Sequence, residues 1–320
     1  MRKKRYIRQA HNMHKITNPI FQELLKLKLI NKKNIVKISD STRDKKIKVF
    51  KDLKSQIIFL EKSVVTHNYY SAFGNQTKKL YSSPYEMDVR GKILKTKHFA
   101  GSRGLIGVND KRRYSMFKKH LLKKEILDYG CCWGGFLSLL KNYSKSCSGV
   151  ELRKACAQYI KKSYKSIDVK DNLTKFDKKF DVITLFHVLE HIPKQVETLK
   201  EIRKKIKKNG KIIIEVPSAL DYLIFIDLPA FKKFTFWSEH LILHTEKSLK
   251  KVLKASGFKK IRVNYLQIYG YANHLGWLLT KRPGGHEYFK EYVDKKFDLD
   301  YRNYLIRRKQ TDTLIAIAEN

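Results

Sequence analysis

Two acidic residues stand at fixed distances from a glycine-containing turn. Asp128 lies two residues before Gly130, and Glu151 lies 21 residues after it. Glycines at such a turn, here Gly130 and Gly134, let the backbone approach a bound molecule before the chain enters a helix. An acid at the position of Glu151 can accept hydrogen bonds from both hydroxyls of a ribose. We therefore expect a nucleoside-type ligand at this turn.

The residues of the turn distinguish two classes of nucleoside cofactor. A dinucleotide site has the pattern G-x-G-x-x-G, because a helix N-terminus must receive a pyrophosphate. Here the pattern is Gly130-x-x-x-Gly134-Gly135, preceded by Asp128, which would repel a phosphate. S-adenosylmethionine carries a sulfonium and an ammonium group, which an acid attracts. The sequence therefore predicts S-adenosylmethionine as the cofactor.

Strands and helices alternate around this turn from about residue 116 onward. Apolar runs predict strands at 125–129, 146–151, 180–185, 211–217, 261–266 and 313–318. Helical spacing predicts helices that begin near 136 and cover 154–165, 196–208 and 246–256, with Gly210 and Gly257 as stop signals. This alternation is typical of an α/β fold with a doubly wound, Rossmann-like sheet, in which ligands bind beyond the carboxyl ends of the strands.

Residues 126–217 resemble the methyltransferase domain of class I S-adenosylmethionine-dependent enzymes, close to the ubiquinone-biosynthesis O-methyltransferases and their bacterial relatives. The resemblance is carried by Ile126 to Cys131, Glu151, Asp171-Asn172, Phe180 to Ile183, His187 to Ile192 and Leu199 to Pro217. It implies a seven-stranded sheet, and it implies that the cofactor is bound by Asp128, Gly130, Cys132, Gly134, Glu151, Asp171, Asn172 and Phe186. Cys132 is a departure, because the family usually has Gly there.

The loop that follows the strand ending at Leu185 contains three candidates for catalysis. Methyl transfer requires an aligned nucleophile, and a hydroxyl acceptor also requires a base. The spacing of His187, Glu190 and His191 would place them on one face of a helical turn. His-x-x-Glu-His is also an inverted zinc-protease signature. Here, however, the three residues lie in a loop after a strand of a methyltransferase-like fold, and no further acidic metal ligand can be identified. The sequence therefore predicts that they bind no metal. In the alternative interpretation Glu190 is structural and only one histidine faces the substrate.

Residues 269–310, between the last two predicted strands, form an insertion that is too long for a simple hairpin. The segments 273–278 and 283–286 resemble the tail of methyltransferases of bacterial surface-polysaccharide pathways, which implies a sugar acceptor, and residues 236–258 resemble the lid and following helix of the methyltransferase family. Two basic residues before Gly284-Gly285 could bind a diphosphate. In the alternative they belong to an ordinary surface turn. Weaker candidates for acceptor binding are His240, Asn273, His274, Lys281, Arg282 and His286.

The first part of the chain is harder to interpret. We assign residues 1–115 to an N-terminal region that could form a lobe on the substrate side of a methyltransferase domain at 116–320. The apolar run Ile57 to Leu60 predicts a buried strand, and residues 91–107 resemble a connecting segment. The aromatic residues Tyr69, Tyr70, Trp237 and Trp277 could stack on a sugar or base, or belong to the core.

The formal net charge of +39, from 69 Lys and Arg against 30 Asp and Glu in 320 residues, is the unusual bulk property. Such a charge would attract nucleic acid, anionic lipid or phosphorylated substrates, although lysine spread along the whole chain can also be ordinary surface. No pattern of an RNA-binding module is recognisable. We therefore favour a small-molecule acceptor, a sugar or nucleotide-linked sugar methylated on O or C, over the alternative of RNA.

Cysteine usage and the absence of long apolar runs bear on location. The four cysteines lack the paired spacing of a zinc ribbon or disulfide framework, and the basic N-terminus lacks the apolar run of a signal peptide. No 18 consecutive apolar residues occur, so no membrane span is expected. These features predict a cytoplasmic protein, whose oligomeric state stays open.

Overall fold

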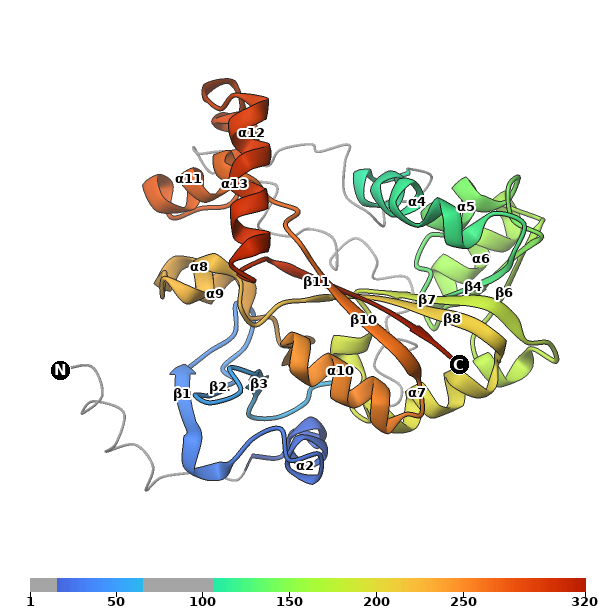
Figure 1. Cartoon of the computed structure of the whole chain (residues 1–320), viewed down its shortest axis with the longest axis horizontal. Coiled ribbons are helices and arrows are strands. Elements are labelled where there is room, and N and C mark those ends of the chain that lie inside the picture. The colour runs from blue at the N-terminus through green and yellow to red at the C-terminus, as the bar shows by residue number, and fades with distance from the viewer. Residues whose placement is uncertain (1–15, 66–105) are drawn as a thin grey trace.

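A seven-stranded sheet dominates the computed structural model, which describes residues 16–65 and 106–320 (Figure 1). The strand order is β10-β11-β8-β7-β4-β5-β6. The strands are β4 (Glu125–Tyr129), β5 (Ser146–Val150), β6 (Ile167–Lys170), β7 (Phe180–Phe186), β8 (Ile206–Pro217), β10 (Lys259–Leu266) and β11 (Thr313–Glu319). The predicted Rossmann-like α/β fold is confirmed.

The order of the strands creates a crevice at the centre of the sheet. From β4 the chain continues outward through β5 to β6, and it then returns to the other side of β4 with β7 and β8, all in parallel pairs. The last strand, β11, lies antiparallel between β8 and β10. Ligands of such sheets bind where the direction of strand addition reverses, which here is at the carboxyl ends of β4 and β7.

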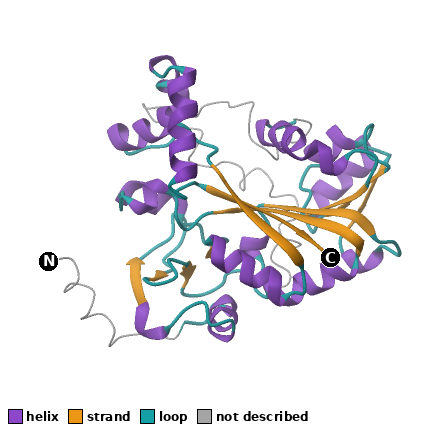
Figure 2. Ribbon diagram, viewed as in Figure 1, coloured by secondary structure: helices purple, strands orange, loops and turns teal. Residues whose placement is uncertain are grey.

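Helices cover both faces of this sheet (Figure 2). One face carries α4 (Val108–Leu121), α5 (Gly135–Leu140) and α6 (Lys154–Ser163), and the other carries α7 (Gln195–Lys204) and α10 (Glu246–Ala255). Because neighbouring residues of a strand point to opposite faces, Ile126 packs in the core with Phe117 and Leu137, whereas Leu127 belongs to the core with Leu199. In the sequence, the buried strands are therefore continuous runs of apolar residues.

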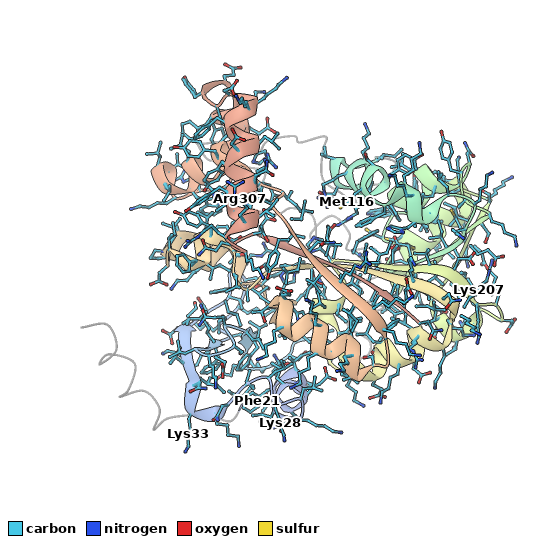
Figure 3. The ribbon with its side chains drawn as sticks, viewed as in Figure 1. Phe21, Lys28, Lys33, Met116, Lys207 and Arg307 are labelled. Atoms are coloured by element: carbon cyan, nitrogen blue, oxygen red, sulfur yellow. The ribbon has the colours of Figure 1, made fainter. Side chains whose placement is uncertain are left out.

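The described part of the N-terminal region packs onto the main domain. It comprises α2 (Pro19–Lys26), the short helix η1 (Lys32–Asn34), β1 (Ile35–Ser39), β2 (Val49–Asp52) and β3 (Ile58–Leu60). These strands form an antiparallel sheet with β9 (Ile242–Leu243). Asn18 Nδ2 donates to the carbonyls of Leu60 and Leu241, each at 3.0 Å. Phe21, labelled in Figure 3, stacks near Phe59 with ring centroids 5.7 Å apart. The predicted buried strand is confirmed as β3.

The insertion before the last strand is helical. It contains α11 (Tyr271–Thr280), α12 (Gly285–Tyr288), η6 (Lys290–Tyr292) and α13 (Lys295–Arg307), which Figure 1 shows grouped at one end of the sheet near α8 (Tyr222–Phe225) and α9 (Pro229–Thr235). No helix of the described ranges is long and apolar enough to cross a membrane. The expected boundary between residues 115 and 116 falls inside α4, so the division into two domains stays a prediction.

Three details differ from the sequence predictions. The helix predicted at 196–208 ends at Lys204, because Ile206 is buried and pairs with Phe180 at the start of β8. Gly210 is therefore no helix stop; a Cβ there would lie 2.6 Å from Ile206 Cγ2. Strand β6 was not predicted, since only Ile167 and Val169 alternate with charged residues. The expectations for Tyr69, Tyr70 and residues 91–105 fall outside the described residues.

Candidate active site

A cavity of about 1250 Å³ lies at the carboxyl ends of β4, β5, β6 and β7. Its walls come from the turn after β4, the ends of β5 and β6, the loop after β7, and residues 237–240. Ligand pockets commonly measure about 300–1,000 Å³. This cavity therefore has room for a nucleoside cofactor together with a small second molecule.

The turn after β4 has the unusual backbone conformation that its glycines suggested. Gly130, Cys132 and Gly134 all have positive φ, at 83°, 51° and 75°. A Cβ on Gly130 would lie 2.5 Å from Val188 Cγ2. The left-handed conformation costs a residue other than glycine about 1–2 kcal/mol, which gives a physical reason for the Gly that the resemblance leads one to expect at the position of Cys132. Gly134 is the N-cap of α5.

Asp128 is buried at the end of β4, and its Oδ1 accepts a hydrogen bond from Thr184 Oγ1 at 2.6 Å. Burial raises the pKa of this carboxyl to about 7, although the hydrogen bond from Thr184 acts in the opposite direction. The charge of Arg113 also acts to lower this pKa, but it does not offset the effect of burial. A cationic ligand group would favour the ionised carboxyl further. Asp128 is therefore suited to the ammonium or sulfonium group of S-adenosylmethionine.

Glu151 at the end of β5 joins the neighbouring strand to the turn. Its Oε2 accepts from the backbone N–H of Cys132 at 2.7 Å, and its Oε1 accepts from the N–H of Arg153 at 2.8 Å. Oε1 also accepts from Nε of Arg153 at 3.2 Å, and Oε2 can accept a further hydrogen bond. Glu151 can therefore hold the turn and still bind ribose hydroxyls.

The other predicted cofactor residues lie around the same cavity. Asp171 is exposed and pairs with Lys175 at 2.7 Å, while Asn172 Oδ1 caps the short helix η4 (Leu173–Lys175) by accepting from Thr174 N at 2.9 Å. Phe186 packs edge-on against Phe136, with 5.0 Å between centroids. Of the eight predicted residues, all except Gly134 line the cavity, so the structure brings them together. Their individual roles stay predictions.

The three predicted catalytic residues are close together, but not on one helical face. His187 has a φ of 54° and precedes the short helix η5 (Leu189–His191). Its Nδ1 lies 3.1 Å from Glu190 Oε1, and its Nε2 lies 3.2 Å from Glu215 Oε1. Burial acts to lower the pKa of His187, but the two carboxylates raise it to about 9. His187 is thus a cation at neutral pH, with both nitrogens beside acids, and is poorly suited to act as a base.

Glu215, near the end of β8, is a residue that the sequence analysis missed. It is fully buried, and its Oε1 accepts from Arg113 at 2.7 Å and from Arg112 at 2.8 Å, both on α4. Burial acts to raise the pKa of Glu215, but hydrogen bonding by His187 and the charge of Arg113 lower it well below its usual value. The signal was present as an acid inside the apolar run 212–216. Its partners were hidden because α4 was not predicted.

His191 and His240 form the cavity wall beside this charged cluster. Their ring centroids are 4.9 Å apart, and His191 Nδ1 lies 3.8 Å from Glu239 Oε2. Burial lowers the pKa of His191 and lowers that of His240 well below its usual value. Both imidazoles are therefore neutral at pH 7. Glu190, His191 and His240 each bring one potential metal-ligand atom to within 4.8 Å of the others.

The weaker acceptor candidates divide into two groups. His240 lines the cavity, whereas Asn273, His274, Lys281, Arg282 and His286 do not. His274 is buried in α11, 2.8 Å from Tyr301 Oη, and Asn273 contacts His286 at 3.2 Å. Trp237 lines the cavity with the Arg43 guanidinium 4.4 Å from its ring centre, and Trp277 is core. The role of the insertion in binding an acceptor stays a prediction.

Comparison with known proteins agrees with this geometry. Residues 105–263 match the family model of the methyltransferase domain. No curated protein matches the chain. Among solved structures, it is similar to a SAM-dependent methyltransferase from Archaeoglobus fulgidus (18% identity, 66% of this chain, 92% of the other, TM-score 0.43). It is also similar to phosphoethanolamine N-methyltransferase 2 from Haemonchus contortus in complex with S-adenosylmethionine (14% identity, 67% of this chain, 53% of the other, TM-score 0.42).

Because the family match spans the turn after β4, the acid after β5 and the crevice between β4 and β7, residues 105–263 form a class I S-adenosylmethionine-dependent methyltransferase domain, with S-adenosylmethionine as its cofactor.

Proposed function

We propose that the enzyme methylates a hydroxyl group of a small-molecule acceptor, a sugar or nucleotide-linked sugar of surface-polysaccharide biosynthesis. The observation that carries the proposal is the pair of neutral imidazoles, His191 and His240, in the wall of the cavity that also holds Asp128 and Glu151. A hydroxyl loses its proton on methylation, so it needs a lone pair nearby. None of the four cysteines, all of which lie in the described residues, forms a disulfide, which fits the predicted cytoplasmic location.

The residues divide the work of the reaction between two sides of the cavity. The cofactor supplies a methyl group on a sulfonium, which is a good leaving group. Asp128 and Glu151 hold its charged and ribose ends, so the methyl group is presented in a fixed direction. His191 and His240 face the acceptor, and one of these neutral imidazoles takes up the hydroxyl proton. His187 keeps Glu190 in place through a hydrogen bond and its opposite charge, and Glu215 in turn holds His187.

The size and lining of the cavity favour a small acceptor. A volume of about 1250 Å³ exceeds the usual range for one ligand by a few hundred Å³, which suits a sugar beside the cofactor. Trp237 offers an aromatic surface of the kind that binds apolar sugar faces. The alternative acceptor, RNA, is favoured only by the net charge of +39.

The proposal is tested by supplying S-adenosylmethionine with a panel of nucleotide-linked sugars, free sugars and bulk RNA. We expect formation of the demethylated cofactor to depend on a sugar and the product to gain one methyl group on oxygen, measured by mass spectrometry and NMR. Methylation of RNA alone, under the same conditions, would show that the acceptor assignment is wrong.

A further inference from the structure

The insertion and the neighbouring helix α8 carry most of the exposed apolar side chains of the described residues. Of fifteen large hydrophobic residues with exposed side chains, seven lie in residues 269–310, and two more, Phe225 and Ile226, lie at the C-terminal end of α8. Single exposed apolar residues are normal, but a group of them in one part of a surface marks a place where another molecule binds. Figure 1 shows these helices together at one end of the sheet.

Two adjacent leucines near the C-terminal end of α11 are directed outward. Leu278 and Leu279 are both exposed, Leu279 to 64%. The helix is held to the protein through the residue before them, Trp277, whose ring centroid lies 5.1 Å from that of Phe231 and 4.6 Å from that of Phe234 in α9. Packing within the chain therefore uses Trp277 and leaves the two leucines on the outer surface.

The exposed side of α13 combines aromatic and basic residues. Phe297, 50% exposed, and Tyr304 are seven positions apart, and Arg308 follows four positions later, so the three lie on one side of the helix. Arg307, labelled in Figure 3, is exposed beside them, and Asp300 is the exposed acid of this side. Apolar rings next to basic side chains on one helix surface are typical of helices that lie at the boundary between water and lipid.

The charge of the insertion is positive. Residues 269–310 contain nine Lys and Arg against five Asp and Glu. Two of the acids have partners within the insertion: Asp298 accepts from Arg302 Nε at 2.6 Å, and Asp294 caps α13 by accepting from the N–H of Lys296 at 2.8 Å. The insertion is therefore basic as well as apolar at its surface, and a basic surface attracts anionic lipid headgroups.

We propose that the insertion docks the enzyme onto the surface of an anionic membrane, with Leu278, Leu279 and Phe297 entering the outer part of the lipid layer. A second copy of the chain would be repelled, because each copy carries a net charge of +39. RNA would match the charge, but leucine side chains contribute nothing to phosphate binding and do not stack on bases as aromatic rings do. A lipid surface that is negative outside and apolar beneath uses both properties of the insertion.

Sedimentation of the full-length protein with lipid vesicles provides the test. We expect binding to vesicles of phosphatidylcholine and phosphatidylglycerol, and binding at least about tenfold weaker to phosphatidylcholine alone, because the basic residues then lose their attraction to the headgroups. No binding of the wild type to the anionic vesicles overturns the proposal.

A pair of substitutions in the insertion tests the apolar part of the surface. Leu279→Gln with Phe297→Gln should lower the partition coefficient by at least about tenfold, because two apolar side chains no longer enter lipid. The matched control is Met116→Gln with Tyr143→Gln, which changes residues 42% and 52% exposed on α4 and after α5 and should stay within about twofold of the wild type. None of the four residues lines the cavity, so an unchanged affinity for S-adenosylmethionine shows that both variants fold. Equal loss in the two pairs overturns the proposal.

A second measurement does not depend on loss of binding. Brominated phosphatidylcholine quenches tryptophan fluorescence within the lipid layer, so it should quench the added fluorescence of Leu279→Trp more than that of Met116→Trp. Equal quenching overturns the proposal. Self-association that the insertion pair abolishes, without vesicle binding, would assign the surface to a second copy of the chain. RNA binding that the same pair abolishes, again without vesicle binding, would assign it to RNA. Either result overturns membrane docking.

Discussion

The two sides of the cavity are built in different ways. Much of the proposed cofactor side comes from a short stretch: the turn after β4 and Glu151 lie within about 25 residues and are joined by a hydrogen bond, and Thr184 on β7 adds a bond to Asp128 from farther along the chain. The acceptor side combines α4, the loop after β7, the end of β8 and residues 237–240, which are distant in sequence. We therefore expect recognition of the cofactor to depend mostly on residues close in sequence, and activation of the acceptor to depend on contacts between distant segments.

The largest expected effect separates the two sides by kinetics. His191→Ala should lower turnover by about 10²- to 10⁴-fold, because it removes a group that assists loss of the acceptor proton. The affinity for S-adenosylmethionine, measured by calorimetry, should stay within about twofold, since His191 belongs to the acceptor side. His120→Ala serves as the control. A matching loss of cofactor affinity in His191→Ala would show that the two sides are not separate.

The reverse experiment alters the cofactor side. Asp128→Ala and Glu151→Ala should each weaken binding of S-adenosylmethionine by about 10- to 150-fold, equivalent to a charge-assisted hydrogen bond of about 1.5–3 kcal/mol. Glu125→Ala is a matched control, because Glu125 begins β4, the strand that also holds Asp128 near its end. Glu125 pairs with Lys207 at the opposite edge of the sheet (labelled in Figure 3). Calorimetry showing no binding by the wild type would contradict the cofactor assignment.

A smaller effect should appear with pH. The pKa of Asp128 is about 7 in the ligand-free protein because the carboxyl is buried. A cationic cofactor binds the ionised form, so its affinity should fall as the pH decreases below 7, by up to about tenfold per unit, and should level off above it. Calorimetry between pH 5.5 and 8.5 measures this dependence. The Asp128→Asn variant should bind S-adenosylmethionine weakly, and its affinity should change little between pH 5.5 and 8.5. If its affinity depends on pH as steeply as that of the wild type, another group causes the dependence.

The smallest expected effect concerns the insertion. Lys281 and Arg282 lie at the end of α11 and do not line the cavity, but the turn that follows them could bind the phosphates of an acceptor. Replacing both with Ala should raise the KM for a nucleotide-linked sugar by about fivefold, as expected for exposed charges, and spare cofactor binding. Loss of affinity for bulk RNA with a smaller salt dependence would favour RNA as the acceptor instead. No change in either would leave an ordinary surface turn.

The contrast between the two sides also explains what the sequence could predict. Asp128, Gly130 and Glu151 were identified because a single turn and two strand ends have a recognisable spacing. Glu215 was visible only as an acid inside an apolar strand, and nothing in its neighbourhood pointed to Arg113, which is about 100 positions away. The structure places His187 and His191 near each other, and their difference in charge depends on which carboxylates the fold places beside each ring. Patterns among residues close in sequence were enough to predict the fold and the cofactor. The charges of the histidines depend on contacts between distant residues, which such patterns do not reveal.

The pairing of β3 with β9 has a consequence for how the chain is made. Phe59 pairs with Ile242, 183 positions later, and Asn18 bonds to Leu241 across 223 positions. At a synthesis rate of about 5–20 residues per second, β3 must wait about 10 to 40 s for its partner strand. Throughout that interval an apolar edge with unpaired backbone groups is available to other chains. The N-terminal strands are thus the region in which aggregation during synthesis would begin, and chaperones that shield nascent apolar segments would act there first.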